Sequence, residues 1–110
     1  MSGFPFQGAS GRHYDYVLVS TENAGAIPLQ AGNYILAQST SGGPVAIYIG
    51  HADSIRNEIT ATTVWNTARL DYKANLIYIH PQLNKQAREA ERGDLVARLH
   101  PPMNALDKAD

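Results

Sequence analysis

Four segments of the chain have the hydrophobic pattern of β-strands. Residues 14–20 alternate apolar and polar side chains and are rich in Tyr and Val, and residues 32–38 form a second such segment. Residues 45–50 are a continuous apolar run ended by glycine, which is typical of a central, buried strand. Residues 75–80 form the fourth segment, and Pro81 stops it. Two adjacent glycines lie between the second and third segments, so we expect a hairpin there.

Three further segments predict helices, because each follows a capping residue or repeats apolar side chains at helical spacing. They are residues 55–62, 64–72 and 85–99. Asp53 or Ser54 can cap the first helix. Asn84 can cap the last one, and the Pro101-Pro102 pair ends it. The order of elements predicts an α+β fold in which two or three helices pack on a small mixed sheet, with a helical crossover between the third and fourth strands.

The length of 110 residues is suited to one domain. Residues 1–13 are rich in Gly and Ser, and we expect them to form a flexible N-terminal arm. Phe4 and Phe6 either dock this arm on the domain or on a partner, or the arm is disordered. Residues 14–104 form the predicted domain, and residues 105–110 form a charged C-terminal tail.

Composition argues against several classes of function. The formal net charge of −1 lacks the strongly basic balance that favours nucleic-acid binding. The chain has no cysteine, which excludes disulfides, thiolate catalysis and cysteine zinc sites, and its four histidines are too scattered for a zinc motif. No window approaches the roughly 20 apolar residues of a membrane span, and residues 1–13 lack the apolar run of a secretory signal. We therefore expect a cytoplasmic or virion-associated protein without a membrane partner.

Two triplets of tyrosine and glycine face each other on the predicted hairpin. Gly32-Asn33-Tyr34 lies on its first strand and Tyr48-Ile49-Gly50 on its second. A helix containing Arg56 follows, then a strand and a final helix, and Pro101-Pro102-Met103-Asn104 comes after them. This arrangement, over residues 32–104, resembles the GIY-YIG nuclease family, and especially its small stand-alone bacterial and phage members.

The resemblance implies hydrolysis of phosphodiester bonds. In the family, a glutamate of the last helix holds one divalent metal ion, and an arginine of the first helix stabilises the negative charge of the transition state. By resemblance, Tyr34 and Tyr48 are the two tyrosines of the hairpin, one of which helps to accept the proton of the nucleophile. His51 takes the basic or polar position after the second triplet, and Asn104 is the asparagine that supports the site.

The chain departs from the family at the two charged positions. The arginine is expected ten residues after Tyr48, where this chain has Glu58. The metal-binding glutamate is expected twelve residues before Asn104, where this chain has Arg92. An arginine has no acceptor for a metal ion, and a glutamate repels a phosphate. In the family both positions face one cleft, so we expect Glu58 and Arg92 to lie there with Tyr48, with an opposite-charge contact preserved.

This exchange predicts that the nuclease reaction is lost and that no metal ion or other cofactor is bound. We expect the domain to be reused as a binding or assembly module, with a protein as partner more than DNA. The sequence makes no prediction of the oligomeric state. A phage accessory role is a further interpretation that rests on analogy alone.

Two alternatives stay open. A shift of one residue in the last helix would make Glu91 the ligand of Mg²⁺ or Mn²⁺, and a shift of two in the first helix would make Arg56 the catalytic arginine. The chain would then be a divergent metal-dependent DNA endonuclease. Its site would be Tyr34, Tyr48, Arg56, Glu91 and Asn104. The other alternative is a non-catalytic nucleic-acid binder.

The remaining candidates favour structural roles. Trp65 is expected to pack against the core rather than to serve as a stacking platform. His80 and His100 flank prolines and are also expected to be structural. The basic side chains of the last helix alternate with acidic ones, which predicts a solvated, ion-paired face.

Overall fold

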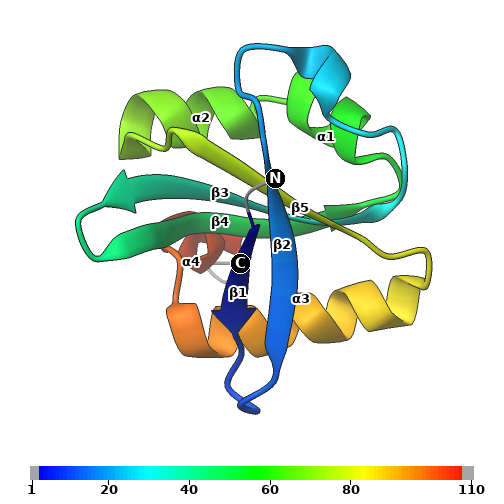
Figure 1. Cartoon of the computed structure of the whole chain (residues 1–110), viewed down its shortest axis with the longest axis vertical. Helices are drawn as coiled ribbons and strands as arrows, with labels where there is room; N and C mark the ends of the chain where they lie inside the picture. Colours follow the sequence, from blue (N-terminus) through cyan, green and yellow to red (C-terminus); the bar gives the residue numbers. More distant parts are fainter. Residues whose placement is uncertain (1–2, 108–110) are drawn as a thin grey trace.

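Five strands form one curled sheet in the order β1-β2-β5-β3-β4, with every neighbouring pair antiparallel (Figure 1). The structure is a computed structural model that describes residues 3–107. Its strands are β1 (Gly3–Gln7), β2 (His13–Val19), β3 (Gly32–Thr40), β4 (Gly43–Ala52) and β5 (Leu76–Pro81). Its helices are α1 (Ile55–Ala61), α2 (Val64–Tyr72), α3 (Lys85–Leu99) and α4 (Pro102–Asp107), with a 3₁₀ turn η1 (Ala24–Ala26). The predicted α+β class and the hairpin of β3 and β4 are confirmed.

The sheet is antiparallel throughout, so the expectation of a mixed sheet is wrong in that respect. The helices α1 and α2 carry the chain from β4 to β5, as expected. However, β5 pairs with β2 and β3, so β3 separates it from β4. The apolar strand β4 is therefore an edge strand and not a central one. Its side chains are nevertheless buried on both faces, with Ile47 and Ile49 in two different hydrophobic clusters.

The three predicted helices are present, and a fourth one was not expected. Ser54 caps α1 by accepting a hydrogen bond from the backbone of Asn57, and Asn84 caps α3 in the same way. Pro102 opens α4, because the first turn of a helix needs no backbone donor. Residues 105–107 consequently belong to a helix, and only the part of the predicted tail at 108–110 lies outside the described residues. Between residues 3 and 107, no helix has the length and apolar character needed to cross a membrane.

The N-terminal segment contains a strand where a flexible arm was expected. β1 pairs with β2 along its whole length. Phe6 is buried, and its ring makes edge-on contacts with Tyr16 and Tyr78. This packing holds β1 to the domain, whereas the Gly- and Ser-rich pattern had suggested mobility. Residues 1 and 2 of the predicted arm lie outside the described part of the chain.

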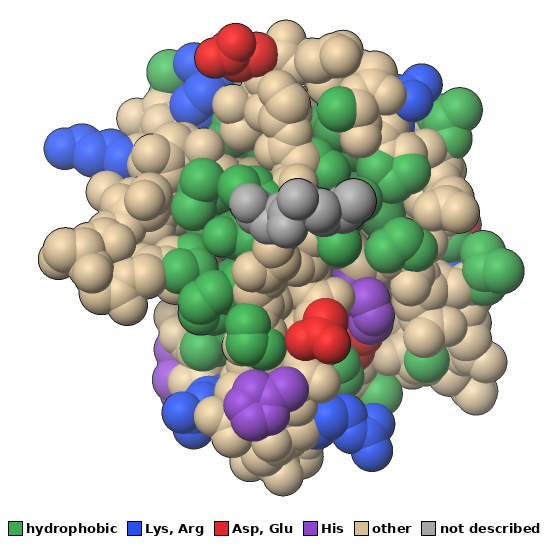
Figure 2. Space-filling view, viewed as in Figure 1, with side chains coloured by type: hydrophobic (Ala, Val, Ile, Leu, Met, Phe, Trp, Pro, Cys, Tyr) green, Lys and Arg blue, Asp and Glu red, His purple; other side chains and the backbone are tan. Residues whose placement is uncertain are grey.

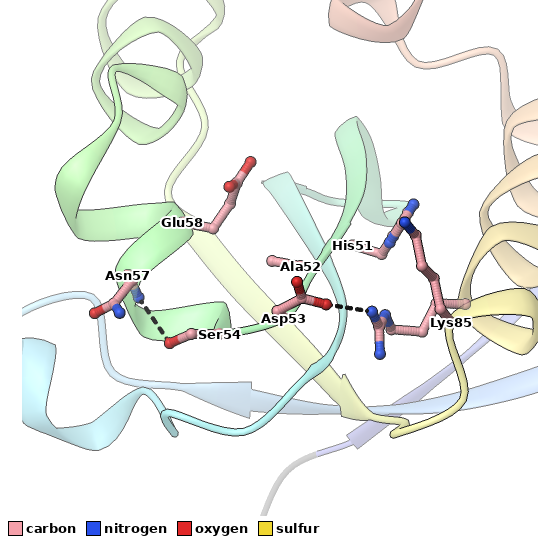
Figure 3. A pocket seen from close by; sticks show the side chains of 8 residues that line it. His51, Ala52, Asp53, Ser54, Asn57, Glu58 and Lys85 are labelled. Carbon is pink, nitrogen blue, oxygen red and sulfur yellow. Dashed lines mark hydrogen bonds and ion pairs between the residues drawn. The ribbon is translucent and has the colours of Figure 1, made fainter.

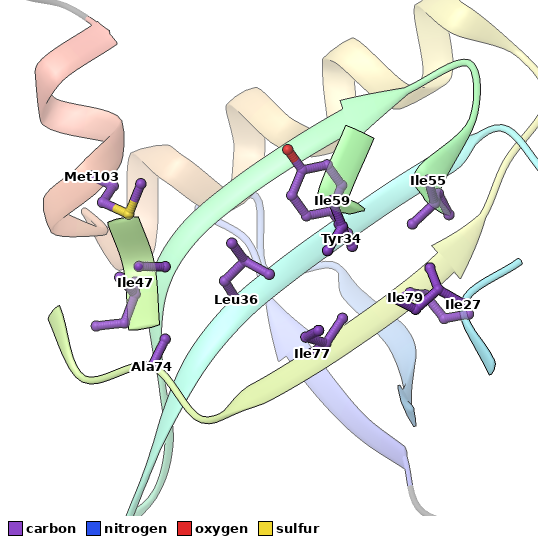
Figure 4. Close-up of a cluster of buried hydrophobic side chains, with 11 residues drawn as sticks. Ile27, Tyr34, Leu36, Ile47, Ile55, Ile59, Ala74, Ile77, Ile79 and Met103 are labelled. Carbon is purple, nitrogen blue, oxygen red and sulfur yellow. The ribbon is translucent and has the colours of Figure 1, made fainter. Parts of the chain in front are cut away.

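Helices cover both faces of the sheet and divide the core in two. On one face, alternate residues of β3 such as Tyr34 and Leu36 pack with Ile55 and Ile59 of α1 (Figure 4). On the other face, the intervening residues of β3 pack with Leu95 and Val96 of α3. In Figure 1, α1 and α2 lie above the hairpin and α3 lies below it. The starts of α1 and α3 thereby come near the end of β4.

Candidate functional site

A cleft of about 450 Å³ opens at the end of β4, between the start of α1 and the start of α3 (Figure 3). It is lined by His51, Ala52, Asp53, Ser54, Asn57, Glu58, Lys85 and Arg88. Glu58 lies on the α1 side, and His51 and Lys85 lie on the opposite side. The two helix caps position these walls, because each cap sets where its helix begins beside the cleft.

The glycines of the two triplets lie where the fold has no room for a side chain. A Cβ atom on Gly50 would come within 2.6 Å of the ring and hydroxyl of Tyr34. A Cβ atom on Gly32 would come within 2.6 Å of the carbonyl oxygen of His80 on β5. Gly50 therefore lets the buried ring of Tyr34 lie across β4, and Gly32 lets β3 approach β5. The triplets have a packing role that their spacing alone does not reveal.

Tyr34 links the hairpin to α1. Its side chain is buried, and its hydroxyl donates to Oε2 of Glu58 at 3.2 Å. The ring of Tyr48 lies beside it, with 6.0 Å between the ring centroids. Burial raises the pKa of Tyr34, and the neighbouring Tyr48 and Glu58 raise it further, while Arg92 acts in the opposite direction. Tyr34 is consequently a protonated donor to Glu58 at neutral pH and cannot serve there as a proton acceptor in its phenolate form.

Arg92 and Asn104 both bind the backbone of Ile49, in the second triplet. Arg92 donates from Nε to the carbonyl of Ile49 at 3.1 Å. The buried side chain of Asn104 accepts from the amide of Ile49 at 2.8 Å and donates to its carbonyl at 2.9 Å. Asn104 thus replaces the missing neighbour strand along this part of the sheet edge. Its observed contacts are those of a structural clamp on β4.

Glu58 and Arg92 approach Tyr34 from different helices, and the contacts described for them run to the hairpin. Among residues 3–107, Glu58 forms no ion pair. Its carboxylate accepts from Tyr34, and Arg92 donates to Ile49. The charge of Arg92 nevertheless reaches both Tyr34 and His51, since it acts on the pKa of each. The hairpin therefore connects the two exchanged charges, through Tyr34 and through the backbone of Ile49.

His51 faces the basic side of the cleft. Burial lowers its pKa, and the cations Arg88, Arg92 and Lys85 lower it further. Its Nδ1 atom is buried and has no hydrogen-bond partner within the described part of the chain. His51 is consequently neutral at pH 7. Three cations of α3 thus act on this wall of the cleft, and Glu89 on the same helix acts in the opposite direction on the pKa of His51.

Arg88 and Asp53 form an ion pair across the cleft that sequence reasoning missed. Nη2 of Arg88 donates to Oδ1 of Asp53 at 2.7 Å. The Arg88 side chain is 3% exposed, whereas that of Asp53 is 96% exposed. Nη1 of Arg88 also donates to the carbonyls of Gln82 and Leu83. The prediction of a solvated basic face on α3 is therefore wrong for Arg88, which is a buried anchor of the helix.

A sequence signal for this buried polar contact exists at Asn33. The signature has an apolar residue at the centre of the first triplet, and this chain has asparagine. Asn33 is fully buried, and its Nδ2 donates to the backbone carbonyl of Arg88 at 3.0 Å. A buried amide requires a polar partner. That requirement could have pointed to polar packing between the hairpin and α3.

Arg56 and Glu91, the residues of the conventional-site alternative, lie outside the cleft. Arg56 donates to the backbone carbonyls of Ile27 and Gly25 and so holds the loop before β3. Glu91 is buried on the other side of α3, where it accepts from the hydroxyl of Tyr16 and contacts Nδ1 of His80 at 2.9 Å. The expected structural role of His80 agrees with this contact. Neither residue is among those that line the cleft.

The residues of the cleft do not fit a divalent cation. Among the described residues, no group of three or more histidine, aspartate or glutamate side chains is arranged to hold a metal ion. The two carboxylates that line the cleft are engaged, Asp53 with Arg88 and Glu58 with Tyr34. The expected ligand position is taken by Arg92, which repels a cation. No catalytic step through a metal ion can be derived from this arrangement.

Comparison of the structure with solved structures finds a similar fold. The chain resembles the crystal structure of the N-terminal GIY-YIG endonuclease domain of UvrC from Thermotoga maritima, a point mutant bound to its catalytic divalent cation. The TM-score is 0.54 and the sequence identity is 22%, over 69% of this chain and 83% of that one. Comparisons of the sequence with protein-family models and with curated proteins returned no match. The fold of this chain is therefore GIY-YIG-like.

Proposed function

We propose that this chain is a GIY-YIG-like domain that has lost the metal-dependent nuclease reaction and uses its cleft for binding or assembly. The observation that carries the proposal is the side chain of Arg92, which occupies the expected ligand position and donates to the carbonyl of Ile49. A guanidinium is a permanent cation with no lone pair to offer a metal. Glu58, at the position of the expected arginine, adds negative charge where the transition state needs positive charge.

We favour a protein over DNA as the partner of the cleft. Asp53 and Glu58 both line the cleft, and each opposes the approach of a phosphate. The net charge of −1 provides no long-range attraction for a polyanion. On the face seen in Figure 2, Lys and Arg side chains are scattered near the margin, while hydrophobic side chains gather over the middle. A surface of this kind is better suited to a protein than to a nucleic-acid backbone.

A cleavage assay tests the loss of activity. The purified protein is incubated with plasmid DNA and with branched DNA in Mg²⁺ and in Mn²⁺, beside Tyr48→Phe purified in parallel. We expect no cleavage, or an equal trace in both preparations that marks a contaminating nuclease. Cleavage by the natural chain that disappears in Tyr48→Phe would contradict the proposal.

A second candidate, a non-catalytic nucleic-acid binder, is favoured by one observation. Lys85, Arg88 and Arg92 all lie close enough to His51 to lower its pKa, after the larger effect of its burial. The exposed Lys85 would contact a phosphate at the start of α3, and the charges of Arg88 and Arg92 would add to the attraction without direct contact by the buried Arg88. Retention of labelled DNA at two salt concentrations separates the candidates, because phosphate contacts weaken steeply with salt. Salt-sensitive retention that falls in Lys85→Gln would favour this second candidate.

A further inference from the structure

A second cleft, of about 330 Å³, lies on the face of the sheet that α1 and α2 cover. The irregular loop after β2 forms one side of it, and the end of α1 and the start of α2 form the other. It shares no lining residue with the cleft at the end of β4. Its volume is at the lower end of the range of small-molecule sites. It is therefore a separate candidate site, sized for one small ligand.

The floor of the second cleft is apolar and aromatic. Ile27, Ile59 and Ile77 belong to the buried cluster on this face (Figure 4). Trp65 is packed against that cluster while it also lines the cleft. The expectation that Trp65 packs against the core is thus confirmed, but part of its surface borders an open space. An indole face beside isoleucine side chains suits an apolar body and can also attract a cation.

Two threonine hydroxyls on the α1 side of the second cleft present acceptors rather than donors. The hydroxyl of Thr60 donates to the carbonyl of Arg56 at 2.7 Å, and the hydroxyl of Thr62 donates to the carbonyl of Glu58. Both hydroxyl protons are therefore engaged inside α1, which leaves oxygen lone pairs for a ligand. An anion would find no free hydroxyl donor at these two positions, whereas an ammonium group brings three donors and no acceptor.

Glu22 alone carries a charge among the residues that line this cleft. Its backbone amide donates to Oγ of Ser20 at 3.2 Å, which holds the turn that presents it. Within residues 3–107, its carboxylate takes part in no ion pair. A carboxylate without a counter-charge, above an apolar floor with a tryptophan, is complementary to a cation with an apolar body.

We propose that the second cleft binds a small organic ammonium ion. The ammonium group lies at the carboxylate of Glu22, and its aryl or alkyl group lies against Trp65 and the isoleucine floor. The proposal goes beyond the function proposed for the first cleft and does not depend on what that cleft binds.

Trp65 is the single tryptophan of the chain, so its fluorescence reports directly on this cleft. The intact protein is titrated with benzylammonium, with the neutral analogue benzyl alcohol and with the anionic analogue benzoate. We expect a saturable change in Trp65 fluorescence with benzylammonium. Benzyl alcohol should bind about tenfold more weakly, because it lacks one exposed ion pair and one cation–π contact. Benzoate should bind more weakly still.

Two variants test whether the carboxylate of Glu22 causes the preference for benzylammonium over benzyl alcohol. Glu22→Gln should bring benzylammonium close to the affinity of benzyl alcohol, since the carboxylate is gone. Glu89→Gln removes the same charge from an exposed site on α3 and should leave the preference unchanged. The absence of a saturable response, equal affinity for the three compounds, or an unchanged preference in Glu22→Gln would each overturn the proposal.

Discussion

At the scale of single residues, the two triplets act through close packing. The ring of Tyr34 covers Gly50, and its hydroxyl reaches Glu58 on α1. The asparagine at the centre of the first triplet reaches the backbone of α3. The triplets thereby connect the hairpin to a helix on each face of the sheet, so one substitution there affects both layers.

Substitution of Gly50 by alanine should destabilise the fold. The added Cβ atom would lie 2.6 Å from the buried ring of Tyr34, which has no space to move. Overpacking of this kind costs about 1–3 kcal/mol of unfolding free energy. Gly93→Ala is the matched control, because nothing lies within 4 Å of a Cβ atom there, and alanine should stabilise α3 by about 1 kcal/mol. Urea denaturation that shows no loss in Gly50→Ala would contradict this packing.

The pKa of His51 should be below its ordinary value of 6.5, because burial and the nearby cations disfavour the imidazolium. Arg92→Gln removes one of these cations, so the pKa should rise. Arg98→Gln, at the far end of the same helix, is the control and should have little effect. An NMR titration of the His51 ring measures its pKa in the natural chain and in each variant. An unchanged pKa in Arg92→Gln would show that Arg92 does not act on the cleft.

The same shift has a consequence for stability. The folded pKa of His51 lies below the unfolded value, so the unfolded chain takes up the proton first as the pH falls. The contribution of His51 to the free energy of unfolding is fully present above about pH 6.5. It decreases as the pH falls toward the pKa of His51 in the folded protein. His51→Gln should therefore make the unfolding free energy less dependent on pH in this window.

At the scale of elements, the placement of α3 depends on an ion pair with unequal partners. Arg88 is buried and satisfies two carbonyls of the loop before α3, whereas Asp53 is solvated. Arg88→Ala should cost about 2–4 kcal/mol, since it leaves a void and unpaired carbonyls. Asp53→Ala should cost less than Arg88→Ala, because Arg88 loses its counter-charge but keeps its packing and both carbonyl acceptors. Equal losses in thermal or urea unfolding would contradict this asymmetry.

The elements differ in how far the sequence alone could predict them. Local signals suffice for α1 and α3, because Ser54 and Asn84 cap them and an apolar side follows. The burial of β1 depends on Tyr16 and Tyr78, which are distant in the sequence, so its composition suggested an arm. The order of strands is equally non-local. A helical crossover predicts that β4 and β5 run in one direction, but not that β3 lies between them.

In the site, too, some features could be predicted from local sequence and others depend on contacts between distant segments. Tyr34 and Tyr48 could be located from the triplets, and their neighbourhood on the hairpin follows from strand pairing. Asp53, Lys85 and Arg88 join the site only when α1 and α3 meet at the end of β4, which no local pattern encodes. The rotation of Glu91 away from the cleft follows from helix geometry, since adjacent residues point about 100° apart. Its partners, Tyr16 and His80, come from other strands.

At the scale of the whole molecule, a GIY-YIG-like fold is combined with a cleft whose charges are unsuited to a cation. The sheet and the helices on its two faces agree with the solved endonuclease domain. The two carboxylates that line the cleft are engaged, Glu58 with Tyr34 and Asp53 with Arg88. Arg92 stands at the sequence position where the resemblance leads us to expect the metal-binding glutamate. These contacts support the proposal that the fold is kept while the metal-dependent reaction is lost and the cleft is used for binding.

The most direct measurement is the effect of Mn²⁺ on the amide NMR spectrum, because a bound paramagnetic ion broadens the signals of nearby residues. We expect no selective broadening of His51, Glu58 or Arg92 when Mn²⁺ is added, while the double variant Glu58→Arg/Arg92→Glu should gain broadening that EDTA reverses. Selective, EDTA-reversible broadening of these residues in the natural chain would show that the cleft holds a metal ion and would contradict the loss of the nuclease reaction.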